Sequence, residues 1–312
     1  MSAGDVKRAR KGQGKARKGA TVAVPEPKEA PRPKLPETLL ILLGTGTPIP
    51  EPNASGPALA IVRGGISYLV DCGPGIVRRA MAAAQVGVPG LTPPQLTRLF
   101  ITHLHSDHTA GLADLMLTPW VVGRLAPLQI HGPPGTRGMV EHILAAYAED
   151  ISIRTSGLEH SDLRAVTPVV HEYKAGLIYQ DNQMKVRAFR VRHGSWPQAF
   201  GFRFESADRI IVVSGDTRPF SGLGRNYKGA DILVHEAYSH AGFSRRTKDW
   251  QKYHAASHTS TLQLAKIANA AQPKLLVLVH QLLFGDTAEM MMAEVKSHYK
   301  GPAVYGRDLM VM

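Results

Sequence analysis

The chain has 312 residues, a single cysteine and a net charge of +12, and 44% of its residues are hydrophobic. This length allows one large domain or two small ones, and the lone Cys72 excludes an internal disulfide framework. No apolar run reaches the length of a membrane span, and no signal-peptide pattern opens the chain. We therefore expect a cytoplasmic protein that has no membrane partner.

The first 38 residues carry half of the net charge. Residues 1–38 contain ten Lys or Arg and four acidic residues, a net +6 of the total +12. They are rich in Gly, Ala and Pro without a periodic apolar pattern, so they cannot bury enough surface to offset the entropy of ordering. We predict a disordered basic tail at 1–38 and one domain at 39–312. Such a tail is either a solvated leader, the commoner case, or a tether to nucleic acid.

The predicted domain begins with three strands, at 39–43, 58–62 and 67–70. Asp71 follows the third strand directly, before the Gly-rich segment Cys72-Gly73-Pro74-Gly75. Helix propensity then rises over residues 76–85.

Four potential metal ligands follow the next apolar strand, at residues 99–101. His103, His105, Asp107 and His108 lie within six residues. An extended backbone places His103 and His105 on the same side, and the chain then turns into a helix that directs the second pair toward the same point. Neutral imidazole and carboxylate are ligands of borderline divalent metals such as zinc. Two ligand pairs side by side predict two ions in one site.

The rest of the chain alternates strands and helices in two similar halves. Further strands are expected at 128–131, 184–191, 199–204, 209–213, 231–234 and 275–279, and helices at 110–117, 136–148, 259–271 and 287–299. Residues 149–182 show no clear pattern, and a long polar loop is expected between Ala237 and His258. Three of the strands end in a further candidate ligand, namely His193, Asp216 and His280. Because neighbouring strands end at the same edge of a sheet, these side chains can converge on one spot.

The pattern His-x-His-x-Asp-His at 103–108 resembles the signature of the metallo-β-lactamase superfamily. The resemblance implies an α/β fold, an αββα sandwich of two mixed β-sheets flanked by helices. It also implies two divalent ions, expected as Zn²⁺ with Mn²⁺ or Fe as alternatives, and a supporting role for Asp71 behind the metal loop. The implied ligands are His103, His105 and His193 for one ion, Asp107, His108 and His280 for the other, and Asp216 for both.

Two further motifs resemble the ribonuclease Z and arylsulfatase-like branch of this superfamily: His235-Glu236-Ala237 and His258-Thr259-Ser260. The resemblance implies that Glu236 and His258 assist proton transfer to the leaving oxygen, with the glutamate raising the pKa of the imidazole. It also implies that Asp107 orients the attacking hydroxide while it binds metal. The alternatives without catalysis are an N-cap role for His258 and a surface salt bridge for Glu236.

The leading functional hypothesis is a dinuclear metal-dependent hydrolase that cleaves phosphodiester or aryl sulfate ester bonds of small or aryl substrates with a metal-bridging hydroxide. One alternative is a ribonuclease Z-type tRNA 3′-processing endonuclease, and another is a metal-containing, non-enzymatic nucleic-acid-binding adaptor. Two departures weigh against tRNA. Pro74-Gly75-Ile76 replaces the acid and Thr-Gln usual in ribonuclease Z, and the usual Gly-Pro-rich tRNA-binding arm is missing between Gly135 and His193. The sequence leaves open whether the chain forms a homodimer.

Overall fold

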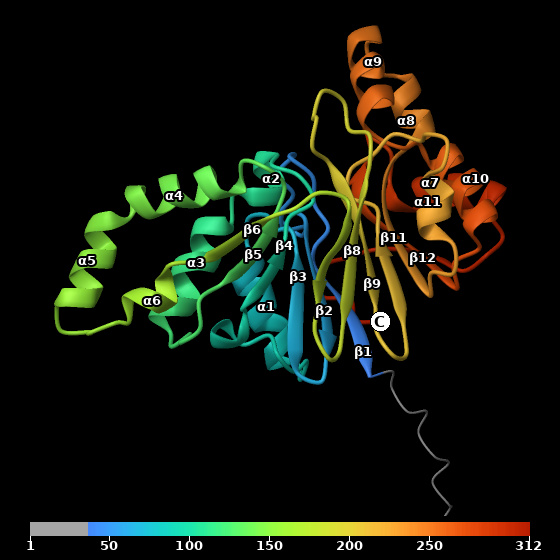
Figure 1. Cartoon of the computed structure of the whole chain (residues 1–312). Coiled ribbons are helices and arrows are strands. Elements are labelled where there is room, and N and C mark those ends of the chain that lie inside the picture. Colours follow the sequence, from blue (N-terminus) through green and yellow to red (C-terminus); the bar gives the residue numbers. More distant parts are fainter. Residues whose placement is uncertain (1–36) are drawn as a thin grey trace, which may run out of the picture. The chain divides into compact units, whose positions relative to one another are not determined.

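Two β-sheets pack against each other in the described part of the chain, and helices cover their outer faces (Figure 1). The computed structural model describes residues 37–312, so residues 1–36 of the predicted basic tail lie outside the described residues. The architecture is the αββα sandwich expected from the sequence.

The first sheet has six strands in the order β1-β2-β3-β4-β5-β6. The first three strands are antiparallel, and β3 to β6 are parallel. Its strands are β1 (Thr38–Gly44), β2 (Ala58–Arg63), β3 (Ile66–Val70), β4 (Arg98–Phe100), β5 (Gln129–Gly132) and β6 (Val169–Glu172). In β1, Leu40 and Leu42 face the second sheet, whereas Ile41 and Leu43 face the outer helices. Both faces are buried, so this strand is a continuous apolar run.

The second sheet has seven strands in the order β13-β12-β11-β10-β9-β8-β7. Strands β10 to β13 are parallel, and β7 to β10 are antiparallel. Its strands are β7 (Gly176–Gln180), β8 (Lys185–Arg190), β9 (Phe200–Glu205), β10 (Ile210–Val213), β11 (Ile232–Tyr238), β12 (Leu275–Leu282) and β13 (Ala303–Tyr305). Phe202 and Phe204 pack with Phe100 of the first sheet to fill the centre of the sandwich.

Two groups of helices cover the outer faces of the sheets. On the first sheet and its extension lie α1 (Ile76–Gln85), η1 (Pro93–Gln95), α2 (Ser106–Thr109), α3 (Leu112–Val121), α4 (Thr136–Ala146), α5 (Ala148–Ser156) and α6 (Leu163–Val166). The helices in the half of the chain that forms the second sheet are α7 (Leu223–Tyr227), α8 (His240–Ser244), α9 (Lys248–Ser257), α10 (Thr261–Ala271) and α11 (Ala288–His298). Among residues 37–312, no helix is both long and apolar enough to cross a bilayer.

Two predictions about local structure were wrong, and one segment without a predicted pattern contains helices and strands. The expected polar loop between Ala237 and His258 contains α8 and α9, and residues 149–182 contain two helices and two strands. Helix α9 buries only His254 and Ser257, so it has no apolar stripe from which a helix could be predicted. The helix expected from Thr259 begins at Thr261, because Ser260 forms a capping box with Gln263.

The parallel strands of both sheets end at the same edge of the sandwich, where the loops after β3, β4, β10, β11 and β12 meet. The candidate metal ligands gather at this edge: His103, His105, Asp107 and His108 follow β4, His193 follows β8, Asp216 follows β10, and His280 lies within β12. The rigid strands therefore position the candidate site.

Candidate metal centre

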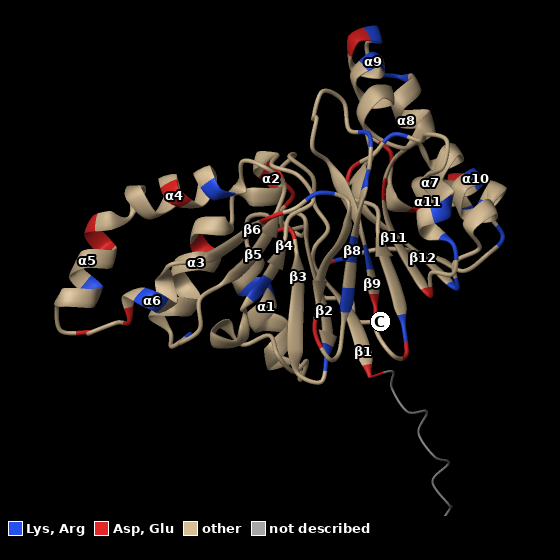
Figure 2. Cartoon of the chain, viewed as in Figure 1, with Lys and Arg blue, Asp and Glu red and all other residues tan. Residues whose placement is uncertain are grey.

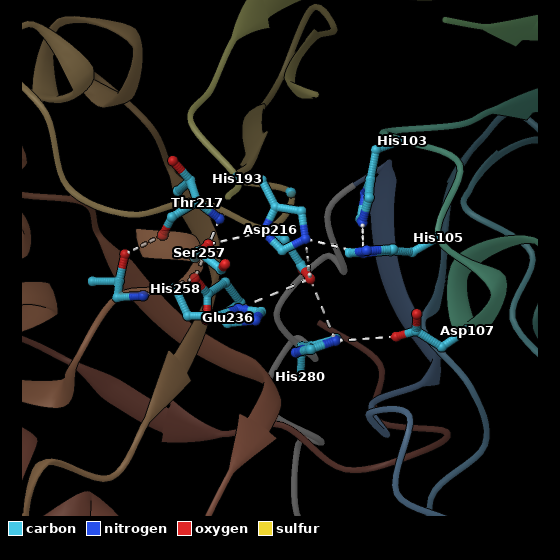
Figure 3. A network of polar contacts seen from close by, with 12 residues as sticks. His103, His105, Asp107, His193, Asp216, Thr217, Glu236, Ser257, His258 and His280 are labelled. Atoms are coloured by element: carbon cyan, nitrogen blue, oxygen red, sulfur yellow. Dashed lines mark hydrogen bonds and ion pairs between the residues drawn. The ribbon is translucent and has the colours of Figure 1, made fainter. Parts of the chain in front are cut away.

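Three imidazoles converge at the meeting point of the two sheets. His103 and His105 follow β4, and His193 follows β8 (Figure 3). The Nδ1 atom of His105 lies 2.9 Å from Nε2 of His103 and 3.0 Å from Nε2 of His193. Nitrogens that share a tetrahedral zinc ion at about 2.0–2.1 Å lie about 3.3 Å apart, so this spacing is close to that of a ligand set.

A second group lies beside the first and contains Asp107, His108 and His280. Asp107 and His108 belong to α2, a single helical turn for which His105 is the N-cap residue. The Nε2 atom of His280 lies 3.2 Å from Oδ2 of Asp107, and Nε2 of His108 lies 3.5 Å from the same oxygen. The two pairs of the hexapeptide therefore lie in adjacent groups of the cluster.

Asp216 occupies the centre of the two groups. Its Oδ2 atom lies 3.5 Å from Nε2 of both His108 and His280, and 3.9 Å from Nε2 of His193. The carboxylate is 3% exposed. As a buried anion, it can offset the charge of several buried donors at once. The seven candidate ligands thus lie together: Asp216 groups with His103, His105 and His193, and it also lies beside the group of Asp107, His108 and His280.

Hydrogen bonds behind the site orient three of these rings. The Thr102 hydroxyl donates to Asp71 and therefore accepts from Nδ1 of His103 at 3.0 Å. The Nδ1–H of His108 donates to Asp71 at 2.8 Å, and that of His193 donates to the carbonyl of Ser257 at 2.9 Å. Each ring consequently presents Nε2 to the cluster, an arrangement that is typical of metal-ligating histidines.

Two site residues adopt the left-handed backbone conformation. Asp71 has φ 58° and His280 has φ 46°, a conformation that costs free energy for residues other than glycine. Strand β12 has a bulge at His280: Glu236 of β11 pairs with Val279 and Ala237 pairs with Gln281, so His280 has no partner in the register of the two strands. This bulge turns the imidazole toward the cluster. The sequence placed His280 at a strand end, whereas it lies within β12.

Burial and mutual repulsion keep several of the imidazoles neutral. Burial lowers the pKa of His103 well below its ordinary value, and the neighbouring His108 lowers it further. Burial and His193 lower the pKa of His105 to about 4. Burial also depresses the pKa of Asp216's neighbour His193. The neutral imidazole is the form that binds metal.

The carboxylates and histidines also shift one another's pKa values, in the direction that favours their charged forms. Burial opposes ionisation of Asp216, but His280 and His108 hold its pKa well below the ordinary range. Burial would lower the pKa of His108, but Asp216 and Asp71 raise it well above its ordinary value. The donor set therefore suits a cation in place of the protons, and two buried ring nitrogens in it, Nε2 of His108 and Nδ1 of His280, have no hydrogen-bond partner among the described residues.

Glu236 and His258 lie next to this cluster and face each other. Oε2 of Glu236 is 3.4 Å from Nδ1 of His258, and neither atom has a hydrogen bond within the described part of the chain. Oε1 of Glu236 accepts from the backbone N–H of Thr259 at 2.9 Å and of Thr217 at 3.3 Å. Both alternatives without catalysis are wrong, because Ser260 is the N-cap of α10 and Glu236 is 1% exposed.

The expected effect of Glu236 on His258 is also wrong. Burial lowers the pKa of His258 to about 4, against the charge of Asp216, which raises it. Burial and the charge of Asp216 raise the pKa of Glu236 well above its ordinary value. A neutral carboxyl group has no charge with which to stabilise an imidazolium. The directions of these two pKa shifts therefore oppose an ion pair between Glu236 and His258.

Two features of the site had no signal in the sequence. The indole N–H of Trp196 donates to Nε2 of His105. Trp196 lies close to His193 in the chain, but this proximity alone did not predict the contact. His258 also belongs, with Asp216 and His280, to a third group whose ligand atoms lie within 4.8 Å of one another. His258 is thus close enough to the cluster to act on whatever is bound there.

The chain is similar to known proteins over the whole of this site. Residues 67–281 match the family model described as Beta-lactamase superfamily domain. The chain is 37% identical over 280 residues to Ribonuclease Z of Mycobacterium bovis (strain BCG / Pasteur 1173P2), which covers 86% of this chain and 96% of that protein. Ribonuclease Z of Mycobacterium sp. (strain KMS) is 40% identical over 248 residues, or 77% of this chain and 83% of that protein.

Solved structures give the same fold. Human tRNase Z, short form, has a TM-score of 0.65 at 25% identity and covers 88% of this chain and 98% of its own. The metallo-beta-lactamase fold protein YhfI from Bacillus subtilis has a TM-score of 0.67 at 18% identity, with coverage of 88% and 99%. The segment matched by the family model contains every residue of the ligand cluster, from His103 to His280.

Proposed function

The chain belongs to the metallo-β-lactamase superfamily, in its ribonuclease Z branch, and on this premise we propose that it is a metal-dependent endonuclease that processes the 3′ ends of tRNA. One observation carries the proposal. The Glu236–His258 pair lies against a complete cluster of seven candidate ligands, within a chain whose relatives are named ribonuclease Z over nearly their full length.

The donor set fits two divalent ions that share Asp216. His103, His105 and His193 would hold one of them, and Asp107, His108 and His280 would hold the other. Zinc suits this mixture of imidazole and carboxylate, and the superfamily favours it. When bound, such ions polarise phosphoryl oxygens and lower the pKa of water.

The protein's own groups would manage the proton of the leaving oxygen. Nδ1 of His258 lies 3.4 Å from Oε2 of Glu236 and 4.0 Å from Oδ2 of Asp216, so the nitrogen that faces Glu236 also faces the cluster. In this scheme Nδ1 of His258 takes the proton held by Oε2 of Glu236 and passes it to the leaving alkoxide. The pair then returns to its first state by taking one proton from water. Such general acid assistance contributes about 10²–10⁴-fold to a rate.

Asp71 and Asp107 have separate tasks in this scheme. Asp71 fixes the orientation of His108 from behind and does not face the cluster with a free oxygen, since Thr102 and His108 occupy its carboxylate. Asp107 is partly exposed and faces His280 from the open side of the site. It is therefore placed to orient the attacking nucleophile by accepting its hydrogen bond.

The surface that leads to the site is suited to a polyanion. Arg187 and Arg190 on β8, and Arg192 just after it, are exposed along the strand that ends at His193. Figure 2 shows basic positions along β8 and β9, and residues 39–312 carry a net +6. A chain of phosphates gains affinity from several such cations, whereas a small monoanion such as an aryl sulfate contacts few of them.

The substrate proposed here differs from the leading hypothesis of the sequence analysis. The relatives support the alternative hypothesis of that analysis, tRNA processing, better than aryl sulfate ester cleavage, which none of these relatives supports. The departures at Pro74-Gly75-Ile76 and between Gly135 and His193 remain differences from the usual family pattern. In place of a Gly-Pro-rich arm, the second of these segments begins with helices α4 and α5.

A substrate panel tests the proposal. The zinc-loaded protein is incubated with a precursor tRNA carrying a 3′ extension, bis(nitrophenyl) phosphate, nitrophenyl sulfate and a β-lactam. We expect cleavage of the precursor tRNA and of the phosphodiester, and no turnover of the sulfate ester. Turnover of the sulfate ester with an intact precursor tRNA would contradict the proposal.

A further inference from the structure

Helices α8 and α9 project from the edge of the second sheet beside the metal centre, at the top of Figure 1. They form the segment between Glu236 in β11 and His258, so both ends of the segment belong to the proposed proton-transfer pair. The proposed chemistry uses only these two ends. The segment itself has no assigned role.

The base of this segment is firmly held. Glu294 of α11 accepts the backbone N–H groups of His240 at 2.9 Å and Ala241 at 2.8 Å. Asp286 accepts from Ser239 and from Arg245. Because these acceptors come from other elements, α8 is a fixed support for α9.

A series of aromatic rings connects the surface of α9 to the metal centre. The ring of Trp250 is stacked on that of His254, with centroids 5.5 Å apart and an interplanar angle of 22°. The His254 ring lies 5.7 Å from that of His258, and the Tyr253 ring lies 6.4 Å from it. Trp250 and Tyr253 are therefore within the reach of one nucleotide from the proposed acid.

The outer two rings of the series are exposed. Trp250 is 49% exposed and Tyr253 is 45% exposed, whereas Trp120 is only 4% exposed. The two rings meet edge to face, with centroids 5.8 Å apart and an angle of 88°. Large exposed aromatic surface beside a functional site marks a place of binding.

Cations surround these rings. The Arg246 guanidinium lies 5.6 Å from the centre of the Trp250 ring, and Lys248 and Lys252 are exposed on the same helix. Within residues 240–257, Asp249 is the only acid, against four Lys or Arg. Aromatic rings set among cations are the composition of surfaces that stack nucleobases and bind the phosphates between them.

We propose that Trp250 and Tyr253 form a stacking site for the nucleobase that flanks the scissile phosphodiester on the side of the leaving oxygen, with Arg246, Lys248 and Lys252 near the adjoining phosphates. This inference rests on the proposed function, because His258 defines the leaving side. Stacking is tolerant of base identity, since every base has a π-face. The site therefore positions the RNA without reading its sequence.

A pairing of side-chain and base deletions tests the stacking site. Dissociation constants are measured by anisotropy with metal-free protein and labelled precursor tRNA, either intact or abasic at the flanking nucleotide. We expect Trp250→Ala to weaken binding of intact RNA by about 5- to 100-fold and to have little effect on the abasic RNA. Trp250→Phe should restore most of the affinity. Tyr147→Ala, which removes another exposed aromatic ring at the α4–α5 junction, is the matched control.

The outcomes separate this inference from the proposed function. The circular dichroism spectrum and the zinc content of Trp250→Ala should match those of the unaltered protein, which shows that the variant folds. Equal losses on intact and abasic RNA, or no loss on either, would overturn the stacking site while cleavage by the unaltered protein stands. If the unaltered protein cleaves no precursor tRNA, the proposed function fails. A change in oligomeric state with unchanged RNA binding would assign Trp250 to a protein interface and would likewise overturn the stacking site.

Discussion

The Nδ1–H of His108 donates to Asp71 at 2.8 Å, although the two residues are 37 positions apart in the chain. The bond fixes Nε2 of His108 toward the cluster, and Asp71 is held in turn by the backbone N–H of Thr102 at 2.7 Å. Loss of such a supporting group typically costs about 10–100-fold in metal affinity.

Replacement of Asp71 should therefore weaken metal binding without removing a ligand. We expect Asp71→Ala to lower the affinity for zinc by about 10–100-fold, measured by competition with a chromogenic chelator. Asp181→Ala is a suitable comparison, because Asp181 is another carboxylate that accepts backbone N–H groups, from Gln183 and Met184, and it lies outside the ligand cluster. Unaltered zinc affinity in Asp71→Ala would show that His108 does not depend on this bond.

Asp216 should affect both ions, since its Oδ2 lies within 3.9 Å of ligands from both groups. We expect Asp216→Ala to abolish turnover and to reduce the bound metal below one ion per chain, whereas His280→Ala should spare the group around His103. Elemental analysis after gel filtration measures the content of each variant. Full metal retention in Asp216→Ala would place the shared ligand elsewhere.

Removal of the proton donor should hurt substrates in proportion to the basicity of their leaving group. A nitrophenolate leaves without a proton, whereas a ribose alkoxide does not. We expect His258→Ala to lose about 10²–10⁴-fold on RNA and far less on bis(nitrophenyl) phosphate. Glu236→Gln should show the same order with a smaller loss, because the amide cannot supply the proton that the carboxyl group of Glu236 holds.

Metal content is the control for these two variants, because His258 also lies in a group that could hold an ion. Equal losses on both substrates, with unchanged metal content, would leave His258 as a positioning residue. Loss of metal from His258→Ala would instead identify it as a ligand.

Asp208 joins the two sheets, and its contribution should depend on pH. It lies in the turn after β9 and accepts from the hydroxyl of Thr38 in β1 at 2.6 Å and from Ser206 at 3.0 Å. Burial opposes its ionisation, but the bonds from Thr38 and Ser206 and the charge of Arg63 lower its pKa to about 2.

A lowered pKa in the folded state stabilises the protein at neutral pH and loses this effect as the pH falls toward that pKa. We expect Asp208→Asn to lower the free energy of unfolding by about 1 kcal/mol at pH 7, since partial exposure screens the interaction. The difference from the unaltered protein should shrink as the pH falls from about 4 to about 2. Urea unfolding at several pH values measures this, and a difference that is constant with pH would contradict the charge-based origin.

The convergence of the candidate ligands could be predicted from the sequence because its signals are local. His103 and His105 are two residues apart after an apolar strand, and the same run of strand and polar terminus recurs at His193 and Asp216. What links the groups is tertiary. The bulge that turns His280 inward depends on the pairing of β11 with β12, which no pattern within β12 encodes.

The proton-transfer pair shows a second limit of sequence reasoning. The motif placed Glu236 beside His258, but burial lowers the pKa of His258 although Asp216 raises it, and burial and Asp216 together raise the pKa of Glu236. The intervening helices escaped prediction because α9 is polar and aromatic on its exposed face. Its packing is provided by rings such as His254 and Phe284, which lie 4.5 Å apart and belong to distant segments.

Cleavage of a precursor tRNA as a function of zinc occupancy tests the proposed chemistry most directly. The protein is stripped of metal and titrated with zinc, and single-turnover cleavage of an end-labelled precursor is followed beside Asp216→Ala. We predict one cut at the 3′ end of the tRNA, at a rate that rises with bound zinc and is absent from the variant. Cleavage without metal, cleavage by Asp216→Ala at the unaltered rate, or an intact precursor at full zinc occupancy would contradict it.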